Sequence, residues 1–214
     1  MLAAAAVLVA CALQVAATRS DARTIAAKAP RKSLVVFSHS FAGYPFTGSW
    51  ATLLAKRKHL KLDSRSEGGD ESAQISVRVL DYQPQASDTV VIEPFINDVR
   101  RFGAAPAALR SYRQSLGLML DHITSPVRPR TIVVLEDPPI LAWDKYPPFN
   151  HGSARAEAAY RKVTADLAKR YRAIVVNAAK GWDTKSMVGP DGVHPNAAGA
   201  AAIARAVAAR IPGP

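Results

Sequence analysis

The chain has 214 residues, of which 49% are hydrophobic and 21% are charged. These proportions are typical of a globular domain with its own core and argue against intrinsic disorder. The formal net charge of +11 favours anionic surroundings such as acidic polysaccharide, a phospholipid surface or nucleic acid. Because the lysines and arginines are scattered and not interleaved with aromatic residues, we expect no nucleic-acid-binding surface.

The first 17 residues carry no charged side chain and form an Ala-rich apolar run that ends in small residues. This pattern is typical of a secretory signal peptide, and the run is short for a membrane span. The single cysteine, Cys11, has surroundings that also resemble a bacterial lipobox, which would instead give a lipid anchor. Residues 18–32 are polar and Ala-rich, as in a linker. We therefore expect a secreted, periplasmic or cell-surface monomer with one folded domain over residues 33–214 and no stable membrane insertion after signal cleavage.

From residue 33 onwards, short apolar runs rich in β-branched residues alternate with amphipathic segments. The runs predicted to be strands are residues 33–37, 61–66, 89–95, 131–137 and 173–179, of which the second is the weakest. The segments predicted to be helices are residues 49–60, 70–83, 105–123, 153–171 and 195–211. This alternation predicts an α/β fold with a central, mostly five-stranded parallel sheet and helices on both faces. In such sheets, functional groups collect at the carboxyl ends of the strands.

Polar side chains stand at predicted strand ends and before the last predicted helix. Ser40 follows the first strand, Asn97 follows the third, and Asp191 precedes His194 by three residues. A serine hydroxyl becomes nucleophilic beside a base, and the base needs an acidic partner that fixes its tautomer. An amide N–H can stabilise the oxyanion that develops during acyl transfer. Together these residue types predict nucleophilic acyl chemistry.

Two of these segments resemble motif blocks of the SGNH hydrolases, also called GDSL-type esterases and lipases. The run Ser38-His39-Ser40 is similar to the Gly-Asp-Ser block of that family, which implies that Ser40 is the nucleophile. Residues 191–195 (DGVHP) match the Asp-x-x-His-Pro block without change. This match implies that His194 is the base and that Asp191 is its acid.

Two further segments resemble the blocks that stabilise the oxyanion in this family. In residues 67–70 (EGGD), Gly69 most naturally supplies a backbone N–H, with Gly68 as the alternative. Residues 95–98 (FIND) resemble Gly-x-Asn-Asp and place the oxyanion amide on Asn97. The backbone N–H of Ser40 completes the oxyanion hole that the resemblance implies.

The resemblance covers residues 33–211 and implies the three-layer α/β/α, flavodoxin-like fold of the SGNH hydrolases. It implies a serine ester hydrolase that works through an acyl-enzyme and uses no cofactor and no metal. We expect ester substrates with short acyl groups, including O-acetyl groups of carbohydrate on an anionic or acetylated polysaccharide. Lipase, thioesterase and acyltransferase activities on the same scaffold stay open as alternatives.

The sequence also departs from the family pattern. His39 stands where the family carries aspartate, and Ser38 and Phe95 stand where it carries glycine. These changes motivate a second hypothesis, a binding protein on the same scaffold that has lost catalysis, and Ser38 remains a rival nucleophile. The candidate substrate contacts are His39, Phe95, Trp143 and His151, although His39 and Trp143 could equally support their loops.

Overall fold

The structure is a computed structural model that describes residues 32–43 and 48–213. The predicted signal peptide, Cys11 and nearly all of the predicted linker lie outside the described residues. In the part of the chain that the structure describes, no helix has the length and apolar character needed to cross a membrane.

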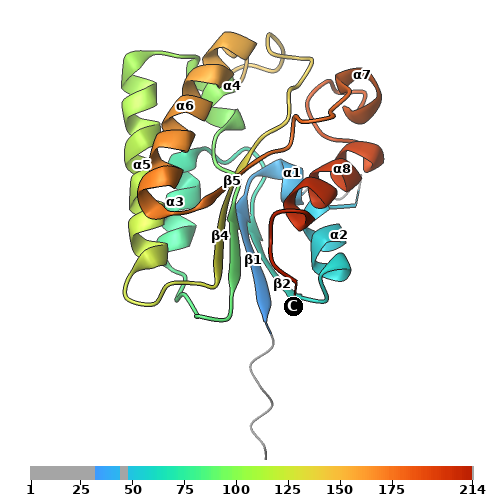
Figure 1. The fold of residues 1–214 in the computed structure, drawn as a ribbon. Helices are drawn as coiled ribbons and strands as arrows, with labels where there is room; N and C mark the ends of the chain where they lie inside the picture. Colours follow the sequence, from blue (N-terminus) through green and yellow to red (C-terminus); the bar gives the residue numbers. More distant parts are fainter. Residues whose placement is uncertain (1–31, 44–47, 214) are drawn as a thin grey trace, which may run out of the picture.

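The described residues form a parallel sheet with the strand order β2-β1-β3-β4-β5 (Figure 1). The strands are β1 (Ser33–Ser38), β2 (Lys61–Ser66), β3 (Thr89–Ile92), β4 (Thr131–Glu136) and β5 (Ile174–Asn177). The prediction of a five-stranded parallel sheet is confirmed. Three strands are shorter than predicted, β4 by one residue and β3 and β5 by three residues each. β3 ends before Pro94, which has no N–H to donate to a ladder, and β5 keeps four residues.

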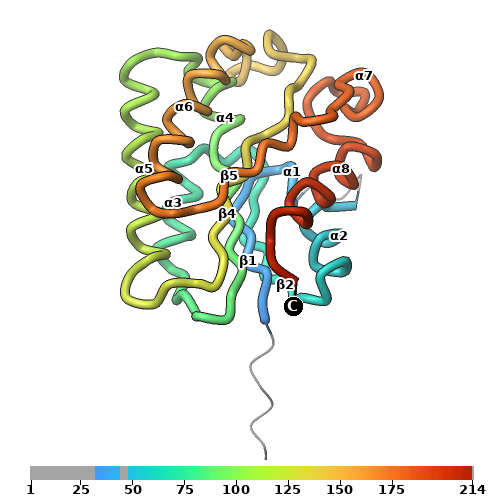
Figure 2. The backbone as a smooth tube through the Cα atoms, in the orientation of Figure 1, coloured from blue at the N-terminus to red at the C-terminus, as the bar shows by residue number. Residues whose placement is uncertain are grey.

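Helices cover both faces of the sheet, as predicted. In Figures 1 and 2, α3, α5 and α6 lie on one side of the sheet, and α2 and α8 lie on the other. These helices are α2 (Trp50–Arg57), α3 (Ser72–Leu80), α5 (Pro106–Thr124), α6 (Ala154–Tyr171) and α8 (Ala197–Ala208). The predictions miss three helices, α1 (Ser40–Gly43), α4 (Ile96–Phe102) and α7 (Thr184–Met187). Helices of four to seven residues are too short to show a helical period in the sequence.

Side chains alternate along β1 and divide the core into two halves. Leu34 packs in one half with buried residues of α2 and α8. Val35 packs in the other half with buried residues of α3, α5 and α6. Both faces of the strand are therefore covered, which explains its nearly continuous apolar sequence.

The direction of the chain across the sheet reverses at β1, which lies between β2 and β3. The connection from β1 to β2 passes through α2 on one face, whereas the connection from β2 to β3 passes through α3 on the opposite face. In open parallel sheets, such a reversal opens a crevice at the carboxyl ends of the strands. Ser40 lies at this end of β1, so the topology itself places Ser40 at the crevice.

Candidate active site

Ser40 begins the short helix α1 close to the end of β1. Its Oγ lies 2.8 Å from Nε2 of His194, although 154 residues separate the two in the sequence. Ser40 is 8% exposed, so its hydroxyl lies in a recess of the crevice and not in bulk solvent. The fold therefore joins the end of the first strand to the loop before the last helix.

Asp191 and His194 belong to one tight turn that precedes α8. Nδ1 of His194 lies 2.5 Å from Oδ2 of Asp191, and Oδ1 of Asp191 accepts the backbone N–H groups of Val193 and His194, both at 2.9 Å. Gly192 in this turn has a φ of +73°, and a Cβ there would lie 2.9 Å from Cβ of Ala142. The position therefore requires glycine. One local turn therefore holds acid and base together, and the backbone N–H groups of Leu141 and Ala142 support it by donating to the carbonyl of Gly192, both at 2.8 Å.

The surroundings of Asp191 keep its carboxylate charged. Burial acts to raise the pKa of Asp191, but the hydrogen bonds from the backbone of Val193 and from the ring and backbone of His194 outweigh it and lower the pKa. A charged Asp191 accepts the proton of Nδ1, which leaves Nε2 of the neutral imidazole as an acceptor for the Ser40 hydroxyl. The three side chains thus form one hydrogen-bonded chain that can withdraw the serine proton.

The segments that resemble the oxyanion blocks lie at the same crevice. A Cβ at Gly68 would lie 3.9 Å from Cβ of Ser40, and Gly69 has a φ of +85°, which favours glycine. Asn97, buried at the start of α4, donates from Nδ2 to the backbone carbonyl of Asp70 at 2.8 Å. The structure thus brings the 68–70 segment to Ser40 and Asn97 to that segment. The second N–H of the Asn97 amide can donate to a ligand.

Asp98, the neighbour of Asn97, anchors this arrangement. Its Oδ2 accepts the backbone N–H of Ser72 at 2.7 Å, and its Oδ1 accepts the Ser72 hydroxyl at 2.5 Å. Burial raises the pKa of Asp98 to about 7, even though the hydrogen bonds from Ser72 favour the charged form. Asp98 therefore fastens the start of α3 to α4, and the position of Asn97 depends on this contact.

His39 lies in the interior, contrary to the prediction that it contacts substrate. Its side chain is fully buried, with Nε2 2.8 Å from Oδ1 of Asp137 and Nδ1 accepting the backbone N–H of Phe41 at 3.4 Å. Burial opposes the charged imidazole, but the charge and hydrogen bond of Asp137, together with the charges of Glu93 and Asp98, outweigh burial and raise the pKa of His39. His39 therefore supports the loop that carries Ser40, which is the alternative that the sequence left open.

Ser38, the rival nucleophile, is also buried. Its hydroxyl donates to Oε2 of Glu93 at 2.5 Å, and the same oxygen accepts Nε1 of Trp50 at 3.1 Å. Burial raises the pKa of Glu93 to about 7. The hydroxyl of Ser38 is thus engaged in the core, whereas that of Ser40 meets His194.

Three of these buried side chains could offer ligand atoms to a metal ion. His39, Glu93 and Asp137 follow the neighbouring strands β1, β3 and β4, and their ligand atoms lie within 4.8 Å of one another. Oε1 of Glu93 and Oδ2 of Asp137 have no hydrogen-bond partner among the described residues. Both ring nitrogens of His39 already have partners, so a metal would have to displace one of them. The contacts present are those of a buried ion cluster beneath the Ser40 loop.

Of the remaining predicted substrate contacts, Phe95 and Trp143 lie in the core or at its edge, whereas His151 lies at the surface. Phe95 is fully buried in an aromatic cluster with α5 and α6, so it does not contact substrate, contrary to the prediction. Trp143 is half-buried and packs against both halves of the core, which fits the alternative role of loop anchor. His151 is exposed, and its backbone N–H donates to the carbonyl of Arg100 at 2.7 Å.

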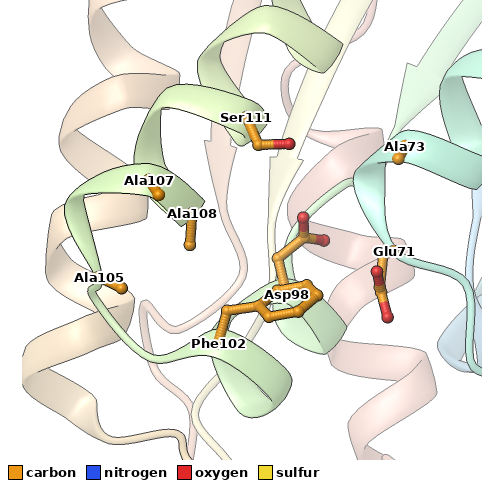
Figure 3. Close-up of a pocket in the computed structure, with 8 residues that line it drawn as sticks. All are labelled: Glu71, Ala73, Asp98, Phe102, Ala105, Ala107, Ala108 and Ser111. Atoms are coloured by element: carbon orange, nitrogen blue, oxygen red, sulfur yellow. The ribbon is translucent and has the colours of Figure 1, made fainter.

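A cavity of about 310 Å³ adjoins the hydrogen-bonded chain. The described residues that line it are Arg100, Tyr146, Phe149, Asp191, Val193 and His194. A larger cavity, of about 400 Å³, is lined by residues of α4, α5 and the start of α3 (Figure 3). Asp191 and His194 line the smaller cavity but not the larger one, and Ser40 lines neither. The smaller cavity is therefore the candidate substrate pocket.

The pocket residues that the predicted site lacks include Arg100 and Phe149. Arg100 follows Asn97 by three residues on α4, and residues at this spacing share a helix face. The spacing is a signal that could have pointed to Arg100. Phe149 lies in the irregular segment between β4 and α6, where no period in the sequence indicates which way a side chain faces.

A comparison with models of known protein families gives a match over most of the sequence. The model of the GDSL-like lipase/acylhydrolase family matches residues 29–202 of this chain. A search of the curated proteins gives no significant match.

Several solved structures share the fold at low sequence identity. A carbohydrate acetylesterase from Sinorhizobium meliloti has 14% identity and a TM-score of 0.67, over 84% of this chain and 98% of that chain. A lipase/acylhydrolase from Enterococcus faecalis has 16% identity and a TM-score of 0.66, over 86% and 99%. A psychrotrophic esterase from Pseudoalteromonas sp. has 16% identity and a TM-score of 0.60, over 82% and 94%. At these identities the likeness shows the fold, which agrees with the fold that the motifs imply.

Proposed function

Because this chain belongs to the GDSL-like lipase/acylhydrolase family, we propose that it is a serine ester hydrolase that works through an acyl-enzyme. The observation that carries the proposal is the continuous chain of hydrogen bonds from Ser40 Oγ to His194 and from His194 to Asp191. Such a chain activates a hydroxyl that is otherwise a weak nucleophile at neutral pH. The departures from the family pattern at positions 39 and 95 do not interrupt this series of hydrogen bonds from Ser40 to Asp191.

In the first half of the reaction, Nε2 of His194 takes the proton of Ser40 as Oγ attacks the ester carbonyl carbon. The resulting oxyanion accepts hydrogen bonds from the backbone N–H groups of Ser40 and Gly69 and from the amide of Asn97. His194 then gives its proton to the alcohol oxygen as the C–O bond breaks, and the acyl group stays on Ser40. Asp191 stabilises the imidazolium throughout.

In the second half, water attacks the acyl-enzyme. His194 takes a proton from the water, the oxyanion forms again in the same place, and Ser40 leaves with the proton that His194 returns. The products are a carboxylic acid and free enzyme. Each step uses side chains and backbone groups of this chain, so we propose that the reaction needs no cofactor.

For the substrate, we propose short acyl esters, including O-acetyl groups of carbohydrate. The small size of the pocket, about 310 Å³, favours a short acyl group. The structural neighbour named as a carbohydrate acetylesterase and the net charge of +11 support an acetylated, anionic polysaccharide. Phe95 does not limit the size of the acyl group, because its ring is in the core.

The test compares two serines in the same short segment. We expect p-nitrophenyl acetate to give a burst of nitrophenol and a fluorophosphonate probe to label Ser40, and we expect Ser40→Ala to abolish both. Ser38→Ala is the matched control, because it removes a neighbouring hydroxyl that does not meet His194, and this variant should still be labelled. Labelling that persists in Ser40→Ala contradicts the assignment. A folded wild-type protein that takes up no label favours the binding-protein hypothesis instead.

A further inference from the structure

Arg100 is a buried cation that forms no ion pair among the described residues. The residue is 6% exposed, and its Nε is buried without a hydrogen-bond partner. Within the described ranges, no carboxylate forms an ion pair with its guanidinium. Arg161, which is also largely buried, shows the usual arrangement, because it pairs with both Glu136 and Glu157. Charged groups are rarely buried unless they are paired, so the isolation of Arg100 calls for an explanation.

The position of Arg100 places it at the candidate pocket. It lines the same cavity as Asp191 and His194, one helical turn beyond Asn97. The guanidinium carbon lies 5.5 Å from the centre of the Phe149 ring, which covers it from the loop before α6. This cation–π contact holds the arginine in place but leaves its N–H groups available to a ligand.

The loop that covers Arg100 is fixed closely on its backbone. The N–H of His151 donates to the carbonyl of Arg100 at 2.7 Å. A Cβ at Gly152 would lie 3.1 Å from Cα of Arg100 and 2.6 Å from the Trp143 ring, so glycine is needed for this approach. Residues 151 and 152 therefore pack directly on the backbone of Arg100, and Phe149 of the same loop covers its guanidinium.

A simpler role for Arg100, holding Asp191 in place, fits the contacts poorly. The Asp191 oxygens are already occupied by the backbone of Val193 and by the backbone and ring of His194. Burial lowers the pKa of Arg100, and the negative charge of Asp191 opposes this effect without an ion pair being formed. Asp191 thus acts on Arg100 through its charge and forms no ion pair or hydrogen bond with it.

We propose that Arg100 is a specificity-determining residue that binds a carboxylate carried by the ester substrate. The planar guanidinium presents a fork of N–H donors that matches a carboxylate in bidentate geometry. A neighbouring hollow of about 350 Å³ shares Asp191 with the pocket and is lined by Lys145 and Lys185, which extends the positive surface outward. The inference rests on the proposed function and narrows its substrate class to acidic esters.

The first measurement uses the wild-type enzyme and two matched pairs of esters. In one pair the acyl group differs, with p-nitrophenyl hemisuccinate against p-nitrophenyl butyrate. In the other the alcohol differs, with the acetyl ester of 3-hydroxybenzoate against that of 3-hydroxybenzamide. We expect kcat/KM to be about tenfold or more higher for the carboxylate in at least one pair, as charge-assisted hydrogen bonds allow. The pair that responds identifies the half of the ester that carries the charge.

The second measurement repeats these ratios in variants. Arg100→Gln should bring the ratio of kcat/KM for the carboxylate ester to that for the neutral ester close to one. Arg100→Lys should retain part of the preference, because lysine still offers a point charge. Arg101→Gln is the matched control, because it is the same substitution at the next residue of α4, on a guanidinium that pairs with Glu71 and does not line the pocket. The control should keep the wild-type ratio.

Two results overturn the inference and leave the proposed function standing. One is a wild-type enzyme that hydrolyses the neutral esters and shows no preference for the carboxylate in either pair. The other is an Arg100→Gln variant that loses rate equally on both members of each pair and shifts the pH profile, because Arg100 would then act on the Asp191–His194 pair. Failure of the proposed function looks different, since no ester is hydrolysed and Ser40 takes up no label. The wild-type ratios decide the matter even if the Arg100 variants fold poorly.

Discussion

Two histidine–aspartate pairs lie close to Ser40, and they differ in their separation along the sequence and in their burial. His194 and Asp191 are three residues apart on one turn, with side chains 23% and 38% exposed. His39 and Asp137 are 98 residues apart, after two different strands, and both side chains are fully buried. An imidazole at the pocket can exchange a proton with a hydroxyl or with water, whereas one sealed in the core can only hold its partners. The environment, and not the pair of residue types, decides which one can react.

The largest expected effect comes from exchanging each histidine for glutamine. We expect His194→Gln to lower kcat/KM by about 10³-fold or more with little change in stability, because glutamine cannot take the serine proton. We expect His39→Gln to lower the free energy of unfolding by about 2–4 kcal/mol, because Asp137 loses its cationic partner in the core. Its kcat/KM should fall by about tenfold at most. Steady-state kinetics and urea denaturation measure the two effects. A well-folded His39→Gln protein that is as inactive as His194→Gln would contradict the purely structural role of His39.

A second prediction concerns Glu93, which lies next to the buried pair of His39 and Asp137. Folding raises the pKa of this carboxyl from 4.5 to about 7, so folding favours the protonated form. The stability from Glu93 is therefore full below about pH 4.5 and is lost as the pH rises through about 7. Glu93→Gln removes the titration, so its stability relative to wild type should rise between these pH values, by at most about 3 kcal/mol.

Urea denaturation at pH values from 4.5 to 8 measures this difference. Glu67→Gln, at an exposed glutamate, is the control and should follow the wild type at every pH. A difference between Glu93→Gln and wild type that stays constant with pH would mean that Glu93 is charged in the folded protein throughout.

The smallest expected effect tests how far the exposed pair, Asp191 and His194, depends on a hydrogen bond from outside its turn. Tyr146 donates its hydroxyl to the backbone carbonyl of Asp191 at 3.0 Å and is 50% exposed. Because the turn has its own internal hydrogen bonds, Tyr146→Phe should change kcat/KM by about threefold at most and the free energy of unfolding by about 1 kcal/mol or less. Thermal denaturation and kinetics on p-nitrophenyl acetate provide the measurement. A loss of about 100-fold would show that the turn cannot hold the pair alone.

The strands and the exposed pair could be predicted because their signals are local. β1, β3 and β4 are short apolar runs buried on both faces, and their composition reflects that burial. β2 is polar and has no buried residue, which is why its signal in the sequence is the weakest. Asp191 and His194 lie within one unaltered motif, so their contact needs no knowledge of the fold. Ser40 could be placed near them because it follows a parallel strand at the sheet edge where functional groups gather.

The buried pair and the arginine could not be predicted because their contacts depend on distant segments. His39 meets Asp137 through the strand order β1-β3-β4, which the amino-acid pattern does not specify. The isolation of Arg100 depends on the packing of Phe149 and Gly152 over α4, from a segment without a regular period. Phe95 was assigned to the pocket by its place beside Asn97, but its ring enters the core instead.

The turn that carries acid and base has a mechanical consequence. The N–H of Gly189 donates to the carbonyl of His194 at 2.7 Å and closes the turn on itself, so Asp191 and His194 move as one body. Of the two hydrogen bonds that link Ser40 to its acid, one spans distant parts of the chain, the 2.8 Å contact between Ser40 Oγ and His194 Nε2. The alignment of Ser40 with its base and acid therefore depends on this distance between two separate segments. Changes elsewhere in the domain that lengthen or shorten this distance therefore alter the activation of Ser40.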